Sequence, residues 1–134
     1  MNHVVVAEDD PFILRLISMW LGRQGFQVHE ARNGLMALEH LQRQRADLLI
    51  SDINMPSMDG LELLGRVMGT PLEPRGVIVL TNRWDHREIS EQLRQWGVHV
   101  CTKPFSPSNL AALVERLVRG DGAAPPPSAQ EASS

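Results

Sequence analysis

The sequence predicts an α/β fold of three layers, in which helices cover both faces of a doubly wound parallel sheet. Five short apolar runs alternate with longer segments whose apolar residues recur at helical spacing, which is typical of repeated strand-helix units. The first run has Val4, Val5 and Val6 in succession, and the absence of polar alternation indicates a strand buried on both faces. The 134 residues are enough for one domain with its own core.

The first half of the chain contains three predicted strands, each followed by a helix. The strands run from His3 to Ala7, from Phe26 to Ala31 and from Asp47 to Ser51, and the last of them ends at Asp52. Asp10-Pro11 supplies a cap and a first-turn proline for the first helix, which Gly25 ends, and Asn33 can cap the second. The third helical segment starts from Asp59. The residues expected to face inward are Ile13, Leu16, Ile17, Trp20 and Leu21, then Leu35, Leu38 and Leu41, and then Leu61, Leu64, Val67 and Met68.

The second half contains two further strand-helix units. The strands are predicted from Val77 to Leu80, ending at Thr81, and from Val98 to Cys101. Ser106 or Ser108 can cap the last helix. The apolar stripes of the two helices are Ile89, Leu93 and Trp96, and then Leu110, Leu113, Val114 and Leu117. We therefore expect a domain over residues 1–120 and, at 121–134, a Pro/Ala/Ser-rich segment that is a disordered tail or a linker.

Composition argues against several classes of partner. The net charge is −3 and the isoelectric point is near 5.9, so nothing attracts the domain as a whole to nucleic acid or to an anionic membrane. The sequence shows neither a signal peptide nor an apolar run long enough to span a bilayer. The single cysteine, Cys101, is compatible with a reducing compartment. We expect a cytoplasmic domain that binds neither nucleic acid nor membrane.

Charged and polar residues follow four of the predicted strands. Glu8 and Asp9 follow the first strand, Asp52 the third, Thr81 the fourth and Lys103 the fifth. Parallel strands bring these ends to one edge of the sheet. Carboxylates about 4 Å apart repel by roughly 4 kcal/mol at an effective dielectric of 20, and a hard cation would offset this. We expect Mg²⁺, which needs few protein ligands, with Asp9 and Asp52 binding directly, Glu8 holding a metal-bound water, and the backbone carbonyl of Asn54 as a further ligand.

These residues also match a family pattern. The order Glu8-Asp9-Asp10, Asp52, Asn54-Met55-Pro56, Asp59-Gly60, Thr81 and Lys103-Pro104-Phe105 resembles bacterial response-regulator receiver domains of the chemotaxis-regulator type, over residues 3–119. The resemblance implies a flavodoxin-like (βα)5 sandwich whose parallel strands have the order 2-1-3-4-5. It also implies roles for individual residues: Asp52 as phosphoacceptor, Asp9 as the main Mg²⁺ ligand, Thr81 as the switch hydroxyl, Lys103 as the cation that contacts the phosphoryl group, and a cis Lys103-Pro104 bond.

The resemblance further implies a function and partners. A receiver domain of this kind takes phosphate from a sensor histidine kinase or a phosphotransfer protein and presents an altered surface to a downstream protein or output domain. A phosphorylation-dependent dimer is compatible with this. Phosphorylation and dephosphorylation of its own aspartate would make the chain a phosphoacceptor and not a turnover enzyme.

The sequence departs from the family pattern at three places. Val100 stands three residues before Lys103, where the family usually has a tyrosine or phenylalanine that moves with the switch hydroxyl. The stretch from Gly97 to Lys103 is one residue shorter than the common spacing, and Asn82 is larger than the usual residue after the switch hydroxyl. We hypothesise that Trp84 takes over the role of the missing aromatic residue, against the alternative that it packs on the neighbouring helix.

Three other functions compete with the phosphorylation switch. A receiver-fold adaptor that works without phosphorylation is favoured by Val100 and Asn82. A phosphohydrolase with an aspartyl-phosphate intermediate is disfavoured, because Asn54 stands where such enzymes carry a second acid. A flavin mononucleotide carrier is disfavoured because the first strand ends in acids and not in a phosphate-binding loop. We interpret the five histidines as surface residues, scattered over different elements without metal-ligand spacing: His3, His29, His40, His86 and His99.

Overall fold

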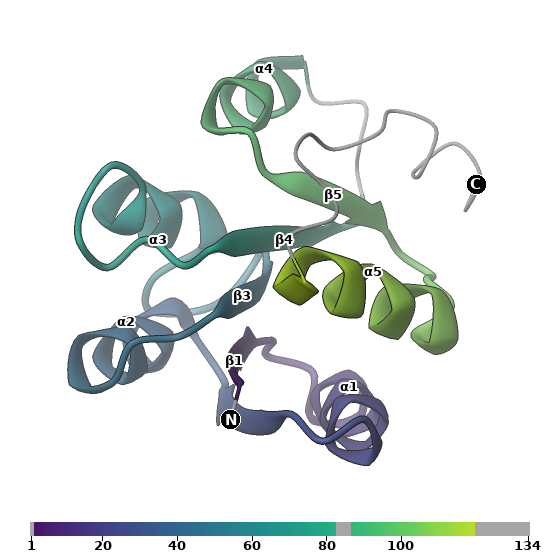
Figure 1. Ribbon diagram of the computed structural model, residues 1–134. Helices are drawn as coiled ribbons and strands as arrows, with labels where there is room; N and C mark the ends of the chain where they lie inside the picture. Colours follow the sequence, from purple (N-terminus) through teal and green to yellow (C-terminus); the bar gives the residue numbers. More distant parts are fainter. Residues whose placement is uncertain (1, 83–86, 120–134) are drawn as a thin grey trace.

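The computed structural model describes residues 2–82 and 87–119 of the chain. Ten strands and helices alternate along this part of the chain (Figure 1). The strands are β1 (His3–Ala7), β2 (Gln27–Ala31), β3 (Leu48–Asp52), β4 (Gly76–Thr81) and β5 (His99–Thr102). The helices are α1 (Pro11–Arg23), α2 (Gly34–Arg43), α3 (Gly60–Val67), α4 (Arg87–Trp96) and α5 (Pro107–Arg119).

The five strands form one parallel sheet in the order β2-β1-β3-β4-β5, as the sequence predicted. Figure 1 shows α1 and α5 on one face of the sheet and α2, α3 and α4 on the other. The chain winds outward from β1 in both directions, and the strand order reverses between β1 and β3. This reversal leaves a crevice beyond the carboxyl ends of these two strands, where open α/β sheets bind their ligands.

Alternate residues of the central strands fill two separate apolar cores. In β1, Val4 and Val6 face the core under α1 and α5, whereas Val5 and Ala7 face the core under α2, α3 and α4. All four side chains are at most 1% exposed. From Val4 to Ala7 this strand is apolar because both of its faces are buried, as the sequence predicted.

Side chains at the helix starts satisfy backbone N–H groups, as predicted from the capping residues. Asp10 accepts a hydrogen bond from the Phe12 N–H at 2.9 Å. Asn33 and Asp59 cap α2 and α3 in the same way, each accepting at 2.8 Å from the N–H three residues later. Of the two serines considered for α5, Ser106 is the cap, since its hydroxyl accepts from the Asn109 N–H at 3.3 Å. The Lys103-Pro104 bond is cis, as the resemblance implied.

Some predicted details are wrong. Phe26, Asp47 and Val98 precede the strands to which they were assigned, and β5 extends one residue beyond Cys101 to Thr102. Leu35, expected to face inward on α2, has 46% of its surface exposed. The buried face of this helix is Gly34, Ala37, Leu38 and Leu41. These positions follow the i, i+3, i+4, i+7 spacing, and Leu35 lies to one side of that stripe.

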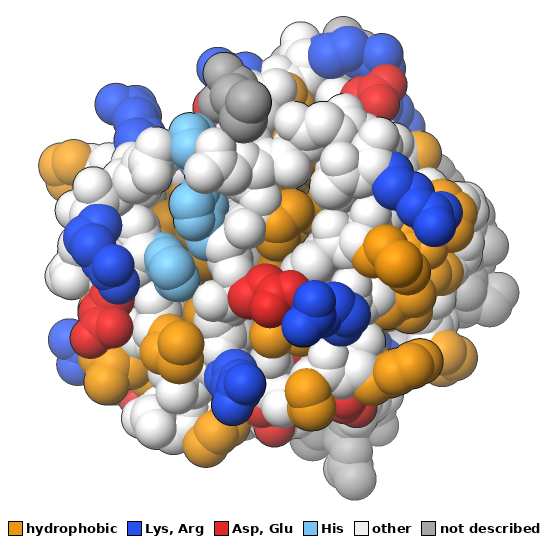
Figure 2. Space-filling model, turned by 90° about the horizontal axis from the view of Figure 1, so that it is seen from below, with side chains coloured by type: hydrophobic (Ala, Val, Ile, Leu, Met, Phe, Trp, Pro, Cys, Tyr) orange, Lys and Arg blue, Asp and Glu red, His pale blue; other side chains and the backbone are white. Residues whose placement is uncertain are grey.

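The interpretation of the histidines as scattered surface residues is wrong in two respects: His99 is buried, and three partly exposed histidines lie together in space. His99 is buried, with 6% of its surface exposed. The rings of His3 and His29 stack with their centroids 5.3 Å apart, and that of His40 lies 5.5 Å from that of His29. Figure 2 shows histidine side chains beside one another on one face of the molecule. Strands β1 and β2 and helix α2 bring them together, although they are far apart in the sequence.

Three expectations concern residues outside the described ranges. They are the role of Trp84, the exposure of His86, and the tail or linker at 121–134. Within the described part of the chain, none of the helices has both the length and the apolar character needed to cross a bilayer.

Two glycines of α3 provide a test of the packing that places Asp52. A Cβ atom at Gly60 would collide with the backbone carbonyl of Asp52, whereas one at Gly65 would meet nothing within 4 Å. We expect Gly60→Ala to destabilise the domain by about 1–3 kcal/mol, because the backbone must shift to admit the methyl group. The matched change Gly65→Ala should stabilise it by about 0.5–1 kcal/mol through helix propensity. Urea unfolding measures both, and equal effects would contradict this packing.

Candidate functional site

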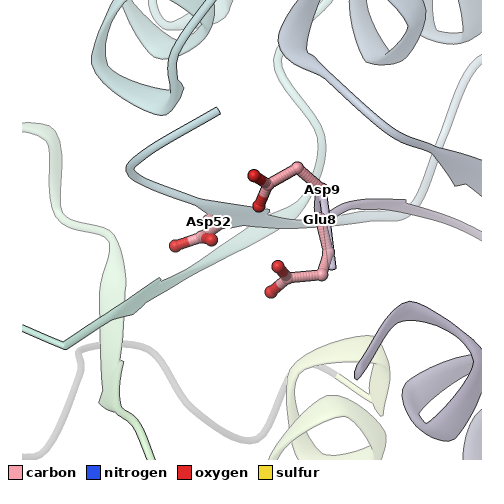
Figure 3. A group of neighbouring side chains, drawn as sticks. All are labelled: Glu8, Asp9 and Asp52. Carbon is pink, nitrogen blue, oxygen red and sulfur yellow. The ribbon is translucent and has the colours of Figure 1, made fainter. Parts of the chain in front are cut away.

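The polar residues predicted to meet do lie at one edge of the sheet. Ser51 of β3 pairs with Ala7 at the end of β1. The next residues of the two strands, Glu8 and Asp9 on one and Asp52 on the other, therefore lie beside each other. Figure 3 shows Glu8 and Asp9 leaving the end of β1 and Asp52 leaving the end of β3. One carboxylate oxygen from each of these three residues lies within 4.8 Å of the other two. We call this group the acidic cluster.

Burial differs among the three acids. Glu8 is 1% exposed and Asp52 is 5% exposed, whereas Asp9 is open to solvent. Two carboxylates are thus held in the protein interior at close range, and their repulsion is of the order of several kcal/mol at an effective dielectric near 20. Such an arrangement persists only where cations or hydrogen-bond donors offset the repulsion.

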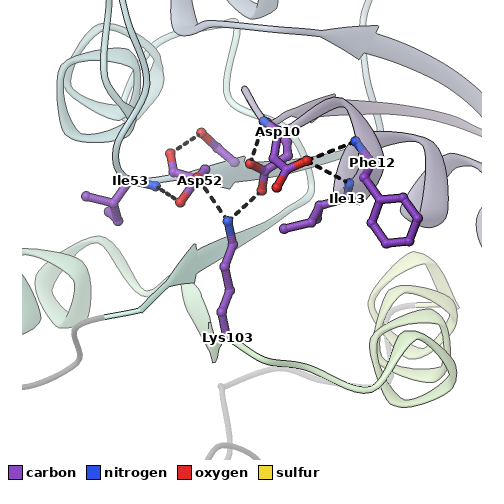
Figure 4. Close-up of polar contacts among 8 residues, drawn as sticks. Asp10, Phe12, Ile13, Asp52, Ile53 and Lys103 are labelled. Carbon is purple, nitrogen blue, oxygen red and sulfur yellow. Dashed lines mark hydrogen bonds and ion pairs between the residues drawn. The ribbon is translucent and has the colours of Figure 1, made fainter.

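Lys103 supplies one positive charge to the acidic cluster. Its ammonium group lies 2.8 Å from Glu8 Oε1 and 3.1 Å from Asp52 Oδ2 (Figure 4). The lysine side chain is only 14% exposed. Burial alone would lower the pKa of Lys103, but the hydrogen bonds to Glu8 and Asp52 outweigh it and raise this pKa above its usual value. Lys103 therefore stays charged and links the fifth strand to the first and third.

Backbone N–H groups satisfy the remaining oxygens of the two buried acids. The Asp10 N–H donates to Glu8 Oε2 at 3.0 Å, and the Ile53 N–H donates to Asp52 Oδ1 at 2.8 Å (Figure 4). Burial raises the pKa of Glu8 to about 7, against the opposing effect of its hydrogen bond with Lys103. Sequence reasoning missed both N–H donors, because a backbone group leaves no signal in the residue type.

The loop after Asp52 is held by apolar side chains and by two close backbone approaches. Ile53, Met55 and Met58 are buried in the core under α2, α3 and α4. The Gly60 N–H donates to the Ile53 carbonyl at 2.8 Å, and the Gly34 N–H donates to that of Met58 at 2.9 Å. A side chain at either glycine would collide with backbone atoms of this loop. The loop thus fixes Asp52 from its C-terminal side.

A cavity of about 750 Å³ opens beside the acidic cluster. Its polar lining includes Glu8, Asp9, Asp52 and Lys103, which the sequence predicted, and the exposed residues Asn54 and Asn82. Ile13, Leu16 and Phe105 form an apolar side of it. Thr81 is placed at the end of β4 as predicted, but it is 5% exposed and is not among the described residues that line the cavity.

The donor set of this site suits a hard divalent cation. The acidic cluster offers carboxylate oxygens, and Mg²⁺ and Ca²⁺ prefer oxygen ligands. Asp9 is the acid with the freest access, because the structure gives both oxygens of Glu8 and of Asp52 a hydrogen-bond partner. The arrangement could hold a cation and an anionic group at once, since Lys103 and the cation would flank the same carboxylate.

Comparison with known proteins places the chain in a family context. A family model described as the response regulator receiver domain matches residues 4–115. The transcriptional regulatory protein SrrA of Staphylococcus aureus is 29% identical over 118 residues, which are 88% of this chain and 48% of that protein. The chain therefore spans about half the length of the curated relatives it matches.

Solved structures of receiver domains share the fold. The signal receiver domain of a signal transduction histidine kinase from Syntrophus aciditrophicus is 34% identical, with a TM-score of 0.79, covering 92% of this chain and 94% of that one. The chemotaxis response regulator CheY4 of Vibrio cholerae is 29% identical, with a TM-score of 0.77, covering 87% and 98%.

Two neighbouring aspartates allow a controlled test of cation binding. Asp9 belongs to the acidic cluster, whereas the Asp10 carboxylate accepts from the N–H groups of Phe12 and Ile13 at the start of α1. We expect Asp9→Asn to weaken Mg²⁺ binding at least about tenfold, since one unit charge at 4 Å is worth about 4 kcal/mol at a dielectric of 20. Asp10→Asn keeps an equivalent cap and should change the affinity far less. Calorimetric Mg²⁺ titration separates them, and a larger loss in Asp10→Asn would refute the assignment.

Proposed function

The chain belongs to the response-regulator receiver domain family of two-component signalling, and from this premise we propose that Asp52 is its phosphoacceptor. The donor would be a sensor histidine kinase or a phosphotransfer protein. An Asp52 carboxylate oxygen forms a bond to phosphorus, while the bond from phosphorus to the donor's histidine nitrogen breaks and the imidazole leaves with the electron pair. The chain takes part in this transfer as an acceptor and not as a turnover enzyme.

The contact between Lys103 and Asp52, 3.1 Å long, is the observation that carries this proposal. Phosphoryl transfer depends mainly on positioning and on neutralising charge at the phosphoryl oxygens. Lys103 is held beside the nucleophile by its second contact with buried Glu8. It can therefore contact a phosphoryl oxygen on Asp52 without leaving its place in the fold.

Asp9, Asp52 and the backbone carbonyl of Asn54 would hold Mg²⁺ in the proposed site, with Glu8 contacting a water on the metal. The oxygen-only chemistry of the acidic cluster supports this choice of ion. The metal would supply charge neutralisation at the phosphoryl oxygens. Lys103 and the cation would offset the charge of the phosphorylated side chain, since a phosphoryl group carries between one and a half and two negative charges.

Thr81 and the surface beyond it would transmit the signal. In this proposal the Thr81 hydroxyl donates to a phosphoryl oxygen, and the loop after β4 and the surface of α4, β5 and α5 repack. Val100 stands at the position of the usual aromatic residue and packs against the core under α2, α3 and α4. Transmission therefore needs a changed route to the downstream partner, which is an output domain, a separate protein or a second copy of the chain. We place these events in the cytoplasm.

A phosphorylation-independent adaptor is the second candidate. Two observations favour it: Val100 is partly buried and is not aromatic, and Asn82 lines the same cavity as Asp52. In this case the receiver fold would bind its partner through a constant surface.

Labelling with acetyl phosphate distinguishes the two candidates. We expect the wild-type chain to gain one phosphoryl group in the presence of Mg²⁺, and Asp52→Asn to gain none. Asp59→Asn is the matched control, because asparagine can replace Asp59 as the cap of α3 and this acid is not part of the acidic cluster. Intact-protein mass spectrometry gives the readout. A folded wild-type chain that stays unlabelled would favour the adaptor.

The proposed switch hydroxyl has a separate test. We expect Thr81→Ala to take up phosphate but to lose the amide chemical-shift changes that beryllofluoride and Mg²⁺ cause in α4, β5 and α5, because the donor to the phosphoryl oxygen is missing. Thr102 pairs with Thr81 in the neighbouring strand, so Thr102→Ala controls for a change in the sheet itself. Equal shift changes in wild-type protein and Thr81→Ala would exclude Thr81 from the switch.

A further inference from the structure

Three histidines meet at the end of the sheet opposite to the acidic cluster. His3 begins β1, His29 lies in the edge strand β2, and His40 lies in α2. His29 pairs with Val5 in the sheet, so His3 and His29 project from the same face, which is the one that α2 covers. A cavity of about 210 Å³ is lined by all three, together with Val5, Arg43, Gln44 and Ala46. We call His3, His29 and His40 the histidine cluster.

The hydrogen bonds of this cluster define where its protons lie. The amide nitrogen of Gln44 is 3.0 Å from His3 Nε2, and an amide nitrogen can only donate. His3 Nε2 is then the acceptor, so the ring hydrogen of His3 is on Nδ1. Nδ1 lies 3.0 Å from His29 Nε2, which accepts this hydrogen. Two ring nitrogens of different strands thus share one proton.

A shared proton between two imidazoles marks a place that a metal ion can take. Tetrahedral zinc with bonds of 2.0–2.1 Å holds its nitrogen ligands about 3.3 Å apart, close to the 3.0 Å separation of His3 Nδ1 and His29 Nε2. His40 Nε2 now makes a 3.3 Å contact with the Glu30 carbonyl at the surface. For His40 to become a third ligand, its partly exposed side chain would have to rotate away from this carbonyl, and the cavity of about 210 Å³ leaves room for a water ligand in its place.

Charge near the cluster permits a cation. Burial, with the neighbouring His40 and His3, lowers the pKa of His29, so its ring is neutral at physiological pH, as a metal ligand must be. Arg43 lines the cavity but is an exposed residue, and its charge is largely screened by solvent. The Asp47 carboxylate accepts a hydrogen bond from the backbone N–H of His3 at 2.8 Å, which places a negative charge next to the start of β1.

We propose that the histidine cluster is a binding site for a zinc-type divalent cation, distinct from the oxygen-lined acidic cluster. Nitrogen ligands select Zn²⁺ or Co²⁺ over Mg²⁺, whereas the carboxylates of the acidic cluster suit Mg²⁺. The two sites occupy opposite ends of β1, so both cations can be bound at once. A cation there would tie the edge strand β2 to β1 and to α2.

Zinc calorimetry on the untagged full chain, with Mg²⁺ in excess, tests this site. We expect one Zn²⁺ per chain, and a loss of affinity of at least about tenfold in His29→Ala and in His3→Ala, since each removes one ligand. His86→Ala controls for binding by any histidine, and Asp9→Asn controls for zinc in the acidic cluster; both should bind as the wild-type chain does. Unchanged affinity in His29→Ala, or affinity lost in Asp9→Asn, would overturn the proposal.

A second measurement avoids the question of whether the variants fold. Ring-proton NMR signals of the wild-type chain, recorded during a Zn²⁺ titration, should shift for His3, His29 and His40 and stay in place for His99. The zinc affinity should also fall at acidic pH, because protons compete with the cation for the imidazole nitrogens. Shifts confined to His86 or His99 would show that zinc binds elsewhere and that the histidine cluster is not a metal site.

Discussion

The ammonium group of Lys103 lies between the carboxylates of Glu8 and Asp52, two acids that the sheet buries side by side. Their mutual repulsion would amount to several kcal/mol at this range. The polar contacts around the two acids offset this repulsion. Lys103 supplies one positive charge, and the N–H groups of Asp10 and Ile53 satisfy the remaining oxygens. A divalent cation beside Asp9 would complete the neutralisation. The groups that stabilise the buried carboxylates in the fold would then also stabilise a phosphorylated, more negative Asp52.

The two apolar cores hold different parts of this site in place. Val6 of β1 and Ile50 of β3 pack in the core under α1 and α5, whereas Met55 and Met58 hold the loop that follows Asp52 in the opposite core. If Asp52 is the phosphoacceptor, as proposed, its fixed position would favour transfer from a docked donor. Change after transfer would have to occur beyond β4, where Thr81 ends the strand. Val100, where we expected an aromatic residue by resemblance, is partly buried against the core under α2, α3 and α4.

Strand β1 links this chemistry to the histidine cluster at its other end. Glu8 follows the strand with a carboxylate, and His3 begins it with an imidazole. Oxygen ligands at one end and nitrogen ligands at the other are suited to different ions, so the proposed Mg²⁺ and zinc-type sites would not compete. Binding at the histidine cluster would stabilise the edge strand β2, which has only one neighbouring strand.

The sequence by itself determined the alternation of strands and helices and the caps at Asp10 and Asn33, because these follow from local periodicity and capping preferences. It also determined that Glu8, Asp9, Asp52 and Lys103 meet, because parallel strands end at one edge of the sheet. It misplaced Leu35, whose exposure depends on how α2 is rotated against the sheet. Only the tertiary structure decided which nitrogens pair in the histidine cluster and which backbone N–H groups contact the acids. Such contacts depend on the register of the strands and on how the helices pack against the sheet. Strand register and helix packing leave no local pattern in the amino-acid types.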